Sequence, residues 1–322
     1  MSKIAWVVHR YYPYPGGSEN NVRNIAEAMV GLGHDVMVWA PTNQGSQNGV
    51  FVTDNYGYLA DPSIDLVIIH GAGPAAQNFI IDNLDAINKK SVYYIIKPEE
   101  TPIHIKALEK CTYVAASTPE DYDFVKKYNV EHKTINVRYG VLASEVFGVK
   151  TFRQKYNLPT DKKMFLSCGG YWYNKAMKEL VADFIRANRD DAFLVTTGYN
   201  YDANYMPQNS ENVYNFILDD HREVYNAMAD ADYYVMNSFE EGYGIVLLES
   251  MFNRLPWISR RIAAAKLFSD HGLTYETSDE LVDYIKNIEQ YKDRFDLERS
   301  YSNVKANHQS LHTALDFLEV LK

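Results

Sequence analysis

The sequence predicts an α/β protein built from two domains. Short apolar runs typical of buried strands alternate with helical apolar spacing in both halves of the chain, and Gly-rich turns follow several of the runs. Between Leu142 and Lys163 this periodicity is lost, which marks a domain boundary. A chain of 322 residues can form two domains that each bury a core. We place the domains at residues 1–145 and 146–302.

Composition excludes several classes of protein. The chain is 46% hydrophobic and 23% charged, as in globular proteins, and its net charge of −10 argues against a broad surface for nucleic acid or anionic lipid. Two cysteines, Cys111 and Cys168, form no disulfide framework and have no metal-type spacing. No apolar run is long enough to span a membrane or to serve as the core of a signal peptide. We therefore expect a cytoplasmic protein.

The N-terminal half begins with a strand–helix–strand unit. A strand at 4–8 leads into a Pro/Gly loop, and a helix follows with Ser18 as its expected N-cap. Four apolar residues repeat at helical spacing before Gly31–Gly33 stop the helix: Val22, Ile25, Ala26 and Met29. A second strand covers 35–39. The Pro/Gly loop thus lies at the carboxyl end of the first strand, where ligands of open α/β sheets bind.

A buried strand at 65–70 ends in His70, after a region at 43–63 that predicts a loop with one short strand near 50–52. A histidine at the end of a strand can bond a ligand hydroxyl or donate to a nascent charge near neutral pH. The alternative is a histidine bonded to a neighbouring carbonyl. Further elements are a helix from Ala75, strands at 92–96, 113–116 and 135–141, and a helix capped by Ser117 or Thr118 with Pro119 at its first position.

The C-terminal half repeats the pattern. A strand at 164–168 is followed by a loop and by a helix at 177–187, whose predicted buried face comprises Leu180, Val181, Phe184 and Ile185. Later strands are expected at 192–197 and 213–218, and a helix begins at Glu223. Helices at 279–291 and 303–321 finish the chain.

The most informative stretch is the corner between an apolar run at 233–236 and a predicted helix at 245–252. Gly242 and Gly244 allow a tight turn and a close ligand, and the unpaired N–H groups of the next helix suit an anion. Glu241 and Glu249 lie roughly 10 to 12 Å apart at helical rise, and carboxylates accept hydrogen bonds from sugar hydroxyls. The alternative is a plain strand and helix with two solvated glutamates.

This Glu-x7-Glu arrangement, Glu241 to Glu249, resembles the signature of retaining GT-B glycosyltransferases of family 4. The resemblance implies two Rossmann-like, doubly wound domains facing a cleft, with a nucleotide-sugar donor held mainly by the C-terminal one. It implies that Glu241 contacts sugar hydroxyls and Glu249 the donor ribose, in a corner completed by Gly242, Tyr243 and Gly244. It also implies that a last helix, about 303–322, packs back on the N-terminal domain.

Other motifs resemble the same family. Pro15-Gly16-Gly17-Ser18-Glu19, followed by Gly33-His34-Asp35-Val36, is similar to its N-terminal glycine loop and Gly-His-x-Val turn. By this resemblance Gly16 and Gly17 approach the donor diphosphate, Lys175 pairs with it, and His70 lines the donor-sugar and acceptor site. The resemblance also implies backbone contacts to the base from Ile217, Leu218 and Asp219.

Two departures from the family pattern concern the donor site. Gly170 stands where the family usually has an arginine, and Arg10 and Arg261 are candidate substitutes. The loop at 260–265 also lacks the family's Gly-Gly and glutamate. Asp230-Ala231-Asp232 matches a metal-binding Asp-x-Asp pattern, but its place between a helix and a strand favours a cap or turn, so we expect no metal.

The resulting hypothesis is transfer of a hexose or similar sugar from a UDP- or GDP-linked donor to an acceptor hydroxyl. We expect retention at the anomeric carbon, with no cofactor besides the nucleotide-sugar co-substrate. The acceptor stays open among glycans, lipids, small molecules and a modified base. Two alternatives remain: a GT-B sugar-nucleotide epimerase or hydrolase, and a non-catalytic sugar-nucleotide-binding subunit.

Overall fold

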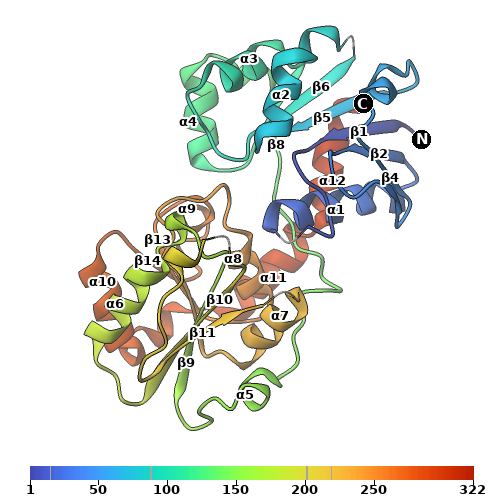
Figure 1. Cartoon of the computed structure of the whole chain (residues 1–322). Helices are drawn as coiled ribbons and strands as arrows, with labels where there is room; N and C mark the ends of the chain where they lie inside the picture. The colour runs from blue at the N-terminus through green and yellow to red at the C-terminus, as the bar shows by residue number, and fades with distance from the viewer. Residues whose placement is uncertain (15, 88, 201, 219) are drawn as a thin grey trace. The chain divides into compact units, whose positions relative to one another are not determined.

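A computed structural model describes residues 1–14, 16–87, 89–200, 202–218 and 220–322. The chain divides into two compact units, Met1–Gly140 with Asn307–Lys322, and Val141–Ala306 (Figure 1). The boundaries predicted from the sequence are at residues 145 and 302. The first unit therefore ends five residues earlier than expected, and the last segment of the chain belongs to it.

The first unit contains a sheet of eight strands among its described residues, in the order β3-β4-β2-β1-β5-β6-β7-β8. The strands are β1 (Lys3–Val7), β2 (Asp35–Trp39), β3 (Gly45–Gln47), β4 (Val50–Thr53), β5 (Leu66–His70), β6 (Lys90–Tyr94), β7 (Tyr113–Ala116) and β8 (Thr134–Asn136). β3 and β4 pair antiparallel, and the other neighbours pair parallel. Because the chain runs outward from β1 in one direction and then from β5 in the other, the sheet is doubly wound.

Helices cover both faces of this sheet. They are α1 (Gly17–Gly31), α2 (Pro74–Asp82), α3 (Pro102–Lys110), α4 (Pro119–Lys127) and α12 (Ser310–Leu318), with 3-10 turns at Tyr56–Ala60, Leu84–Ala86, Glu131–Lys133 and Glu319–Leu321. α2, α3 and α4 pack on one core, and α1 lies beside α12 (Figure 1). Trp6 of β1 meets Phe317 of α12 edge to face, with ring centroids 5.3 Å apart. The last helix thus completes the layer that α1 begins.

The second unit forms a sheet of six described strands in the order β11-β10-β9-β12-β13-β14, and all neighbours pair parallel. The strands are β9 (Lys163–Cys168), β10 (Ala192–Gly198), β11 (Val213–Ile217), β12 (Tyr233–Met236), β13 (Trp257–Arg260) and β14 (Leu273–Tyr275). This is the order 3-2-1-4-5-6 of a dinucleotide-binding fold, in which the direction of winding reverses between β9 and β12.

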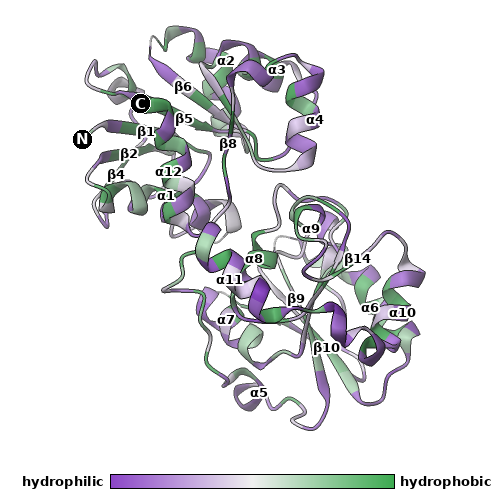
Figure 2. Cartoon of the chain, turned by 180° about the vertical axis from the view of Figure 1, so that it is seen from behind, coloured by the Kyte–Doolittle hydropathy of each residue, from purple (hydrophilic) through white to green (hydrophobic). Residues whose placement is uncertain are grey.

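The helices of the second unit are α5 (Phe152–Lys155), α6 (Met177–Ala187), α7 (His221–Asp230), α8 (Ile245–Phe252), α9 (Ala264–Leu267), α10 (Ser278–Lys286) and α11 (Leu297–Asn307). 3-10 turns lie at Tyr173–Lys175, Ala203–Tyr205 and Ile288–Arg294. α6 and α10 pack together over one face of the sheet. Figure 2 shows apolar residues concentrated on the strands and on the helix faces that meet them.

Three sequence predictions about helices are wrong. Ser18 is not a cap, because α1 already begins at Gly17 and its N-cap, Gly16, makes no side-chain bond. The helix predicted at 303–321 is two helices, α11 and α12, because Gln309 and His312 form a capping box that starts a new helix. On α6 the side chain of Ile185 is 55% exposed, while Asp183 is buried and bonds Arg186.

Candidate functional site

The winding of the second sheet reverses between β9 and β12, and ligands of open α/β sheets bind outside the carboxyl ends of the strands at such a reversal. The loop after β9 carries Lys175, and the loop after β12 carries Glu241. The two residues are 66 positions apart in sequence, yet Lys175 Nζ lies 2.6 Å from Glu241 Oε1. Two predicted site residues therefore meet across the reversal point.

The Lys175–Glu241 ion pair is partly shielded from water. The side chain of Glu241 is 11% exposed, and the same oxygen accepts a hydrogen bond of 2.6 Å from the Ser238 hydroxyl. A charge-assisted pair in such surroundings is shorter and stronger than one on the open surface. Because each partner neutralises the other, the pair keeps a buried carboxylate and an ammonium in place when no ligand supplies a counter-charge.

The corner between β12 and α8 has the geometry that its glycines suggested. Gly244 adopts φ 87°, which is a left-handed conformation, and acts as the N-cap of α8 without a side-chain cap. Tyr243 is buried, and its carbonyl accepts the N–H of Ala264 at 3.0 Å. The first N–H groups of α8 thus begin directly behind the glycine, as an anion site requires.

Glu249 lies inside the protein on α8. It is 9% exposed, and its Oε1 accepts a hydrogen bond of 3.1 Å from the Tyr225 hydroxyl of α7. Removal from water raises the pKa of this carboxyl to about 7, and the bond from Tyr225 opposes the shift only in part. A ligand whose hydroxyl groups donate hydrogen bonds to this carboxyl would stabilise its charged form.

The region predicted to contact the base follows β11. Leu218 is buried and its N–H is already bonded to the carbonyl of Gly198, at 3.3 Å. The N–H of Leu218 is therefore engaged within the sheet edge. Ile217 is 46% exposed, and Asp219 lies outside the described residues.

Two alanines beside these loops hold backbone conformations that L-residues rarely adopt. Among the described residues nine non-glycines have positive φ, and six of them are asparagines, which tolerate it. Ala176, next to Lys175, has φ 49°, and Ala263, just before α9, has φ 45° and ψ −125°. Such outliers cluster at functional sites. Ala263 also shows that the loop lacking the expected Gly-Gly keeps a glycine-like backbone.

In the first unit the winding reverses between β1 and β5, and the predicted residues again follow those two strands. His70, the last residue of β5, is only 4% exposed. Burial lowers its pKa to about 4, so the ring is neutral at pH 7. Its Nε2 atom has no hydrogen-bond partner among the described residues, and Tyr94 packs against the ring at 5.9 Å.

The glycine loop of the first unit is partly covered by its own chain. A carboxylate oxygen of Glu19 occupies the space where a side chain at position 16 would begin. Burial raises the pKa of Glu19. The carboxyl group of Glu19 therefore lies against Gly16, one of the two glycines predicted to approach the diphosphate. Pro15 of the predicted motif lies outside the described residues.

The candidate substitutes for the absent loop arginine are differently placed. Arg10 belongs to the first unit and stacks on the ring of Tyr14, 4.2 Å from its centroid. Arg261 follows β13 in the second unit and lies 3.8 Å from the carboxylate of Glu276. Arg261 is therefore on the same sheet edge as Lys175 and Gly170.

The Asp230–Asp232 pair has a structural role. Asp230 accepts the backbone N–H of Arg153, and Asp232 accepts the N–H of Met164 and a bond from the Arg153 guanidinium. Among the described residues no group of three or more His, Cys, Asp or Glu is arranged to hold a metal ion. None of the helices in the described part of the chain is both long and apolar enough to cross a membrane.

Comparison with known proteins places these loops in a family. Residues 162–291 match the model of the family described as Glycosyl transferases group 1. The second unit contains a group 1 glycosyl transferase domain. The matched residues of this glycosyl transferase domain include Lys175, Glu241 and Glu249. No curated protein matches the chain in sequence.

Solved structures share the fold of the whole chain. Sucrose-phosphate synthase from Thermosynechococcus elongatus has a TM-score of 0.81 at 16% identity, covering 100% of this chain and 98% of that one. The Anabaena protein HepE in complex with UDP and glucose has a TM-score of 0.78 at 14% identity, covering 100% and 99%. A glycosyltransferase from Rickettsia africae gives 0.76 at 17% identity, covering 99% and 97%. These structures confirm the predicted GT-B fold, and the family match at 162–291 is to glycosyl transferases.

Proposed function

We propose that the chain is a retaining glycosyltransferase that moves a hexose from a UDP- or GDP-linked donor to an acceptor hydroxyl. The observation that carries this proposal is the Lys175–Glu241 pair at the reversal point of the group 1 glycosyl transferase domain. A UDP-linked hexose is the first donor to test, because HepE was solved in complex with UDP-glucose and shares this fold.

Donor binding would exchange one ion pair for two sets of ligand contacts. Lys175 would turn from Glu241 to the donor diphosphate, whose charge the N–H groups at the start of α8 also neutralise. Glu241, released from the lysine, would accept hydrogen bonds from sugar hydroxyls. Glu249 would accept hydrogen bonds from the ribose. The same lysine would stabilise the leaving phosphate as the glycosidic bond breaks.

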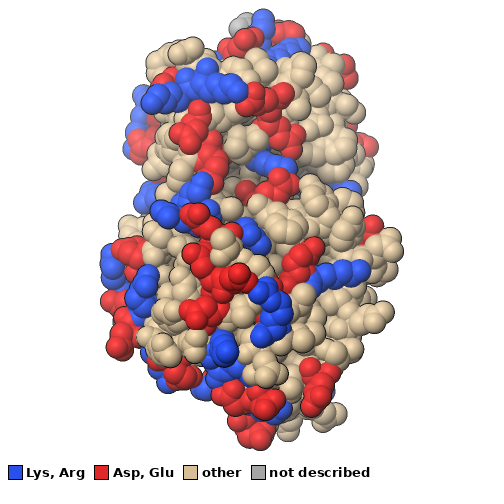
Figure 3. All heavy atoms as spheres, turned by 90° about the vertical axis from the view of Figure 1, so that its left-hand side faces the viewer, with Lys and Arg blue, Asp and Glu red and all other residues tan. Residues whose placement is uncertain are grey.

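The described residues on the face of the molecule drawn in Figure 3 form no surface suited to a polyanion. Acidic and basic side chains are interspersed on the face drawn in Figure 3, with no extended patch of one sign among the residues described there. The chain carries 42 acidic and 32 basic side chains.

The mechanism we propose is attack on the sugar carbon from the side of the leaving phosphate, with retention. Neither carboxylate of the corner serves as a nucleophile, because both are assigned to ligand hydroxyls.

A non-catalytic donor-binding subunit is the second candidate, because Gly170 stands where the family usually has an arginine. The discriminating experiment uses radiolabelled UDP- and GDP-sugars with a pool of glycan, lipid and small-molecule acceptors. We expect label to enter an acceptor, and Glu241→Gln to reduce transfer at least about a hundredfold. The neighbouring Glu240→Gln is the matched control and should retain activity. A donor that binds but is never turned over would favour the second candidate, and isomerised donor without acceptor would indicate an epimerase.

A further inference from the structure

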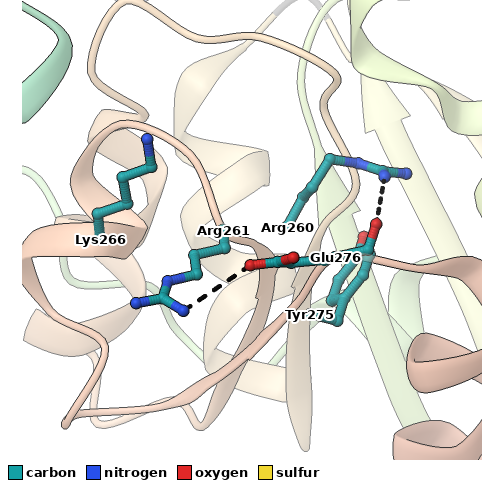
Figure 4. Close-up of a pocket in the computed structure, with 5 residues that line it drawn as sticks. All are labelled: Arg260, Arg261, Lys266, Tyr275 and Glu276. Carbon is teal, nitrogen blue, oxygen red and sulfur yellow. Dashed lines mark hydrogen bonds and ion pairs between the residues drawn. The ribbon is translucent and has the colours of Figure 1, made fainter.

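A basic pocket lies at the carboxyl ends of β13 and β14. It has a volume of about 510 Å³ and is lined by Arg260, Arg261, Lys266, Tyr275 and Glu276 (Figure 4). The lining thus contains three cationic side chains and one carboxylate, in a chain whose net charge is −10. The Arg261–Glu276 contact is long, at 3.8 Å, and both side chains are exposed, so it neutralises little of the positive charge.

The guanidinium of Arg260 is held in a fixed orientation. It packs over the rings of Phe239 and Tyr275, at 5.2 and 5.3 Å from their centroids, and donates to Asn237 Oδ1 at 3.2 Å. Asn237 is itself fixed, because it donates to the carbonyl of Ala176 at 2.8 Å and accepts the Tyr275 hydroxyl. A planar guanidinium that is already oriented loses little conformational freedom when it binds an anion.

The order of the strands locates this pocket relative to the donor site. Leu218 follows β11, Lys175 follows β9, Glu241 follows β12, and the pocket follows β13 and β14. Neighbouring strands are about 4.8 Å apart, so the pocket lies roughly 10 to 15 Å past the carboxyl end of β9, on the side of Glu241. The Ala264 N–H bond to the Tyr243 carbonyl ties its loop to the corner.

In the proposed donor complex the base, the diphosphate and the sugar follow one another along this edge of the sheet. The diphosphate then belongs beside Lys175 and the sugar hydroxyls beside Glu241. A substituent that reaches the basic pocket is then attached to the sugar on the side away from the diphosphate. The position therefore argues against the diphosphate as occupant, although Arg261 is on the same edge as Gly170.

We infer that the basic pocket binds an anionic group, a carboxylate or a phosphate, carried by the sugar substrate. Arginine side chains match the two oxygens of such a group with paired N–H donors, and a neutral sugar offers nothing that requires three cations. The transferred sugar is then an acidic one, such as a uronic acid. This inference rests on the proposed function, since the sugar must first be presented by a bound nucleotide.

The inference is tested by isothermal titration calorimetry of nucleotides and nucleotide sugars with the full chain. UDP, UDP-glucose and UDP-glucuronate form one set, and GDP, GDP-mannose and GDP-mannuronate form a second. We compare the unaltered protein with Arg261→Gln/Lys266→Gln, which leaves the anchored Arg260 intact. Lys286→Gln/Arg294→Gln removes two exposed cations elsewhere in the same unit and is the matched control. A further arm adds glucose or glucose 6-phosphate to protein saturated with UDP.

We expect the uronate donor to bind about tenfold more tightly than its neutral counterpart, and the pocket variant to reduce this preference to less than about threefold. Affinity for UDP or GDP alone should change less than about twofold, and the control should keep the preference. The preference should fall as ionic strength rises from about 0.01 M to 0.15 M. The same dependence for glucose 6-phosphate, without a uronate preference, would refute an acidic transferred sugar and assign the anionic group to the acceptor.

Equal binding of acidic and neutral sugars by the unaltered protein, in both the donor and the acceptor arms, would overturn the inference and leave the proposed function standing. A tenfold loss of UDP affinity in the pocket variant would also overturn it, because the pocket would then hold the diphosphate. Failure of every nucleotide and nucleotide sugar to bind would instead refute the proposed function, and this inference with it.

Discussion

Replacing Glu249 by glutamine should make the second unit more stable at alkaline pH. The carboxyl has a pKa of about 7 in the folded protein, against an ordinary value of 4.5 for glutamate, because burial disfavours its charged form. The folded state therefore holds the proton more tightly than the unfolded state. This contribution to stability is complete below pH 4.5 and is lost as the pH rises through 7. Glutamine mimics the protonated form and can still accept the Tyr225 hydroxyl.

The size of the effect follows from the shift. A rise in the pKa of Glu249 from 4.5 to about 7 corresponds to about 3 kcal/mol of unfolding free energy, at roughly 1.4 kcal/mol per pKa unit. For a unit of this size 1 kcal/mol moves Tm by roughly 2 to 4 °C. Glu249→Gln should thus unfold roughly 6 to 12 °C above the unaltered protein at pH 8, and within about 2 °C of it at pH 4.5. Scanning calorimetry of the full chain at both pH values resolves the transition of the second unit.

Glu179→Gln, which removes an exposed carboxyl from α6 of the same unit, is the control and should unfold alike at both pH values. A Tm difference between Glu249→Gln and the unaltered protein that does not change with pH would show that the folded protein does not raise the pKa of Glu249. The raised pKa of Glu249 should also make ligand binding depend on pH. If ribose hydroxyls donate to the charged carboxylate, affinity for UDP-glucose, whose diphosphate does not titrate in this range, should rise more than about tenfold between pH 5 and 8 in the unaltered protein and change little in the variant.

Three other substitutions probe separate features. Lys175→Met should lower donor affinity about tenfold or more and destabilise the second unit by about 1 to 2 kcal/mol, because Glu241 loses its counter-charge. Unchanged donor affinity in calorimetry would show that Lys175 is not part of the site. Ala263→Gly should raise stability by about 1 kcal/mol by relieving the positive φ, and a drop in Tm would show that the loop relaxes in solution. Thr118→Ala should cost the first unit about 1 kcal/mol by breaking the capping box with Asp121, seen in urea titration, while UDP affinity stays constant; a loss below about 0.3 kcal/mol would contradict it.

Much of the fold could be predicted because local patterns and tertiary packing agree. The strand Tyr233–Met236 and the helix Ile245–Phe252 have the predicted bounds, since an apolar run, two glycines and a helical apolar repeat leave few alternatives. The capping box at Thr118 and the helix Met177–Ala187 are local features of the same kind. These elements fix the corner that the candidate site needs.

What could not be predicted depends on contacts between distant residues. Ile185 is exposed although its position favours the core, because Asp183 is satisfied by Arg186 and by the Ser278 hydroxyl of α10. The Lys175–Glu241 pair joins loops that come together only when β12 is placed beside β9. His70 was expected to open toward a ligand, and its burial depends on packing that a single strand pattern does not contain.

A crystal structure of the chain with bound UDP or GDP would show whether Lys175, Glu241 and Glu249 form the donor site. We expect the diphosphate to lie within about 3 Å of Lys175 Nζ, Lys175 to have left Glu241, and the ribose to donate hydrogen bonds to Glu249. A nucleotide bound elsewhere, with the Lys175–Glu241 contact still at 2.6 Å, would contradict it.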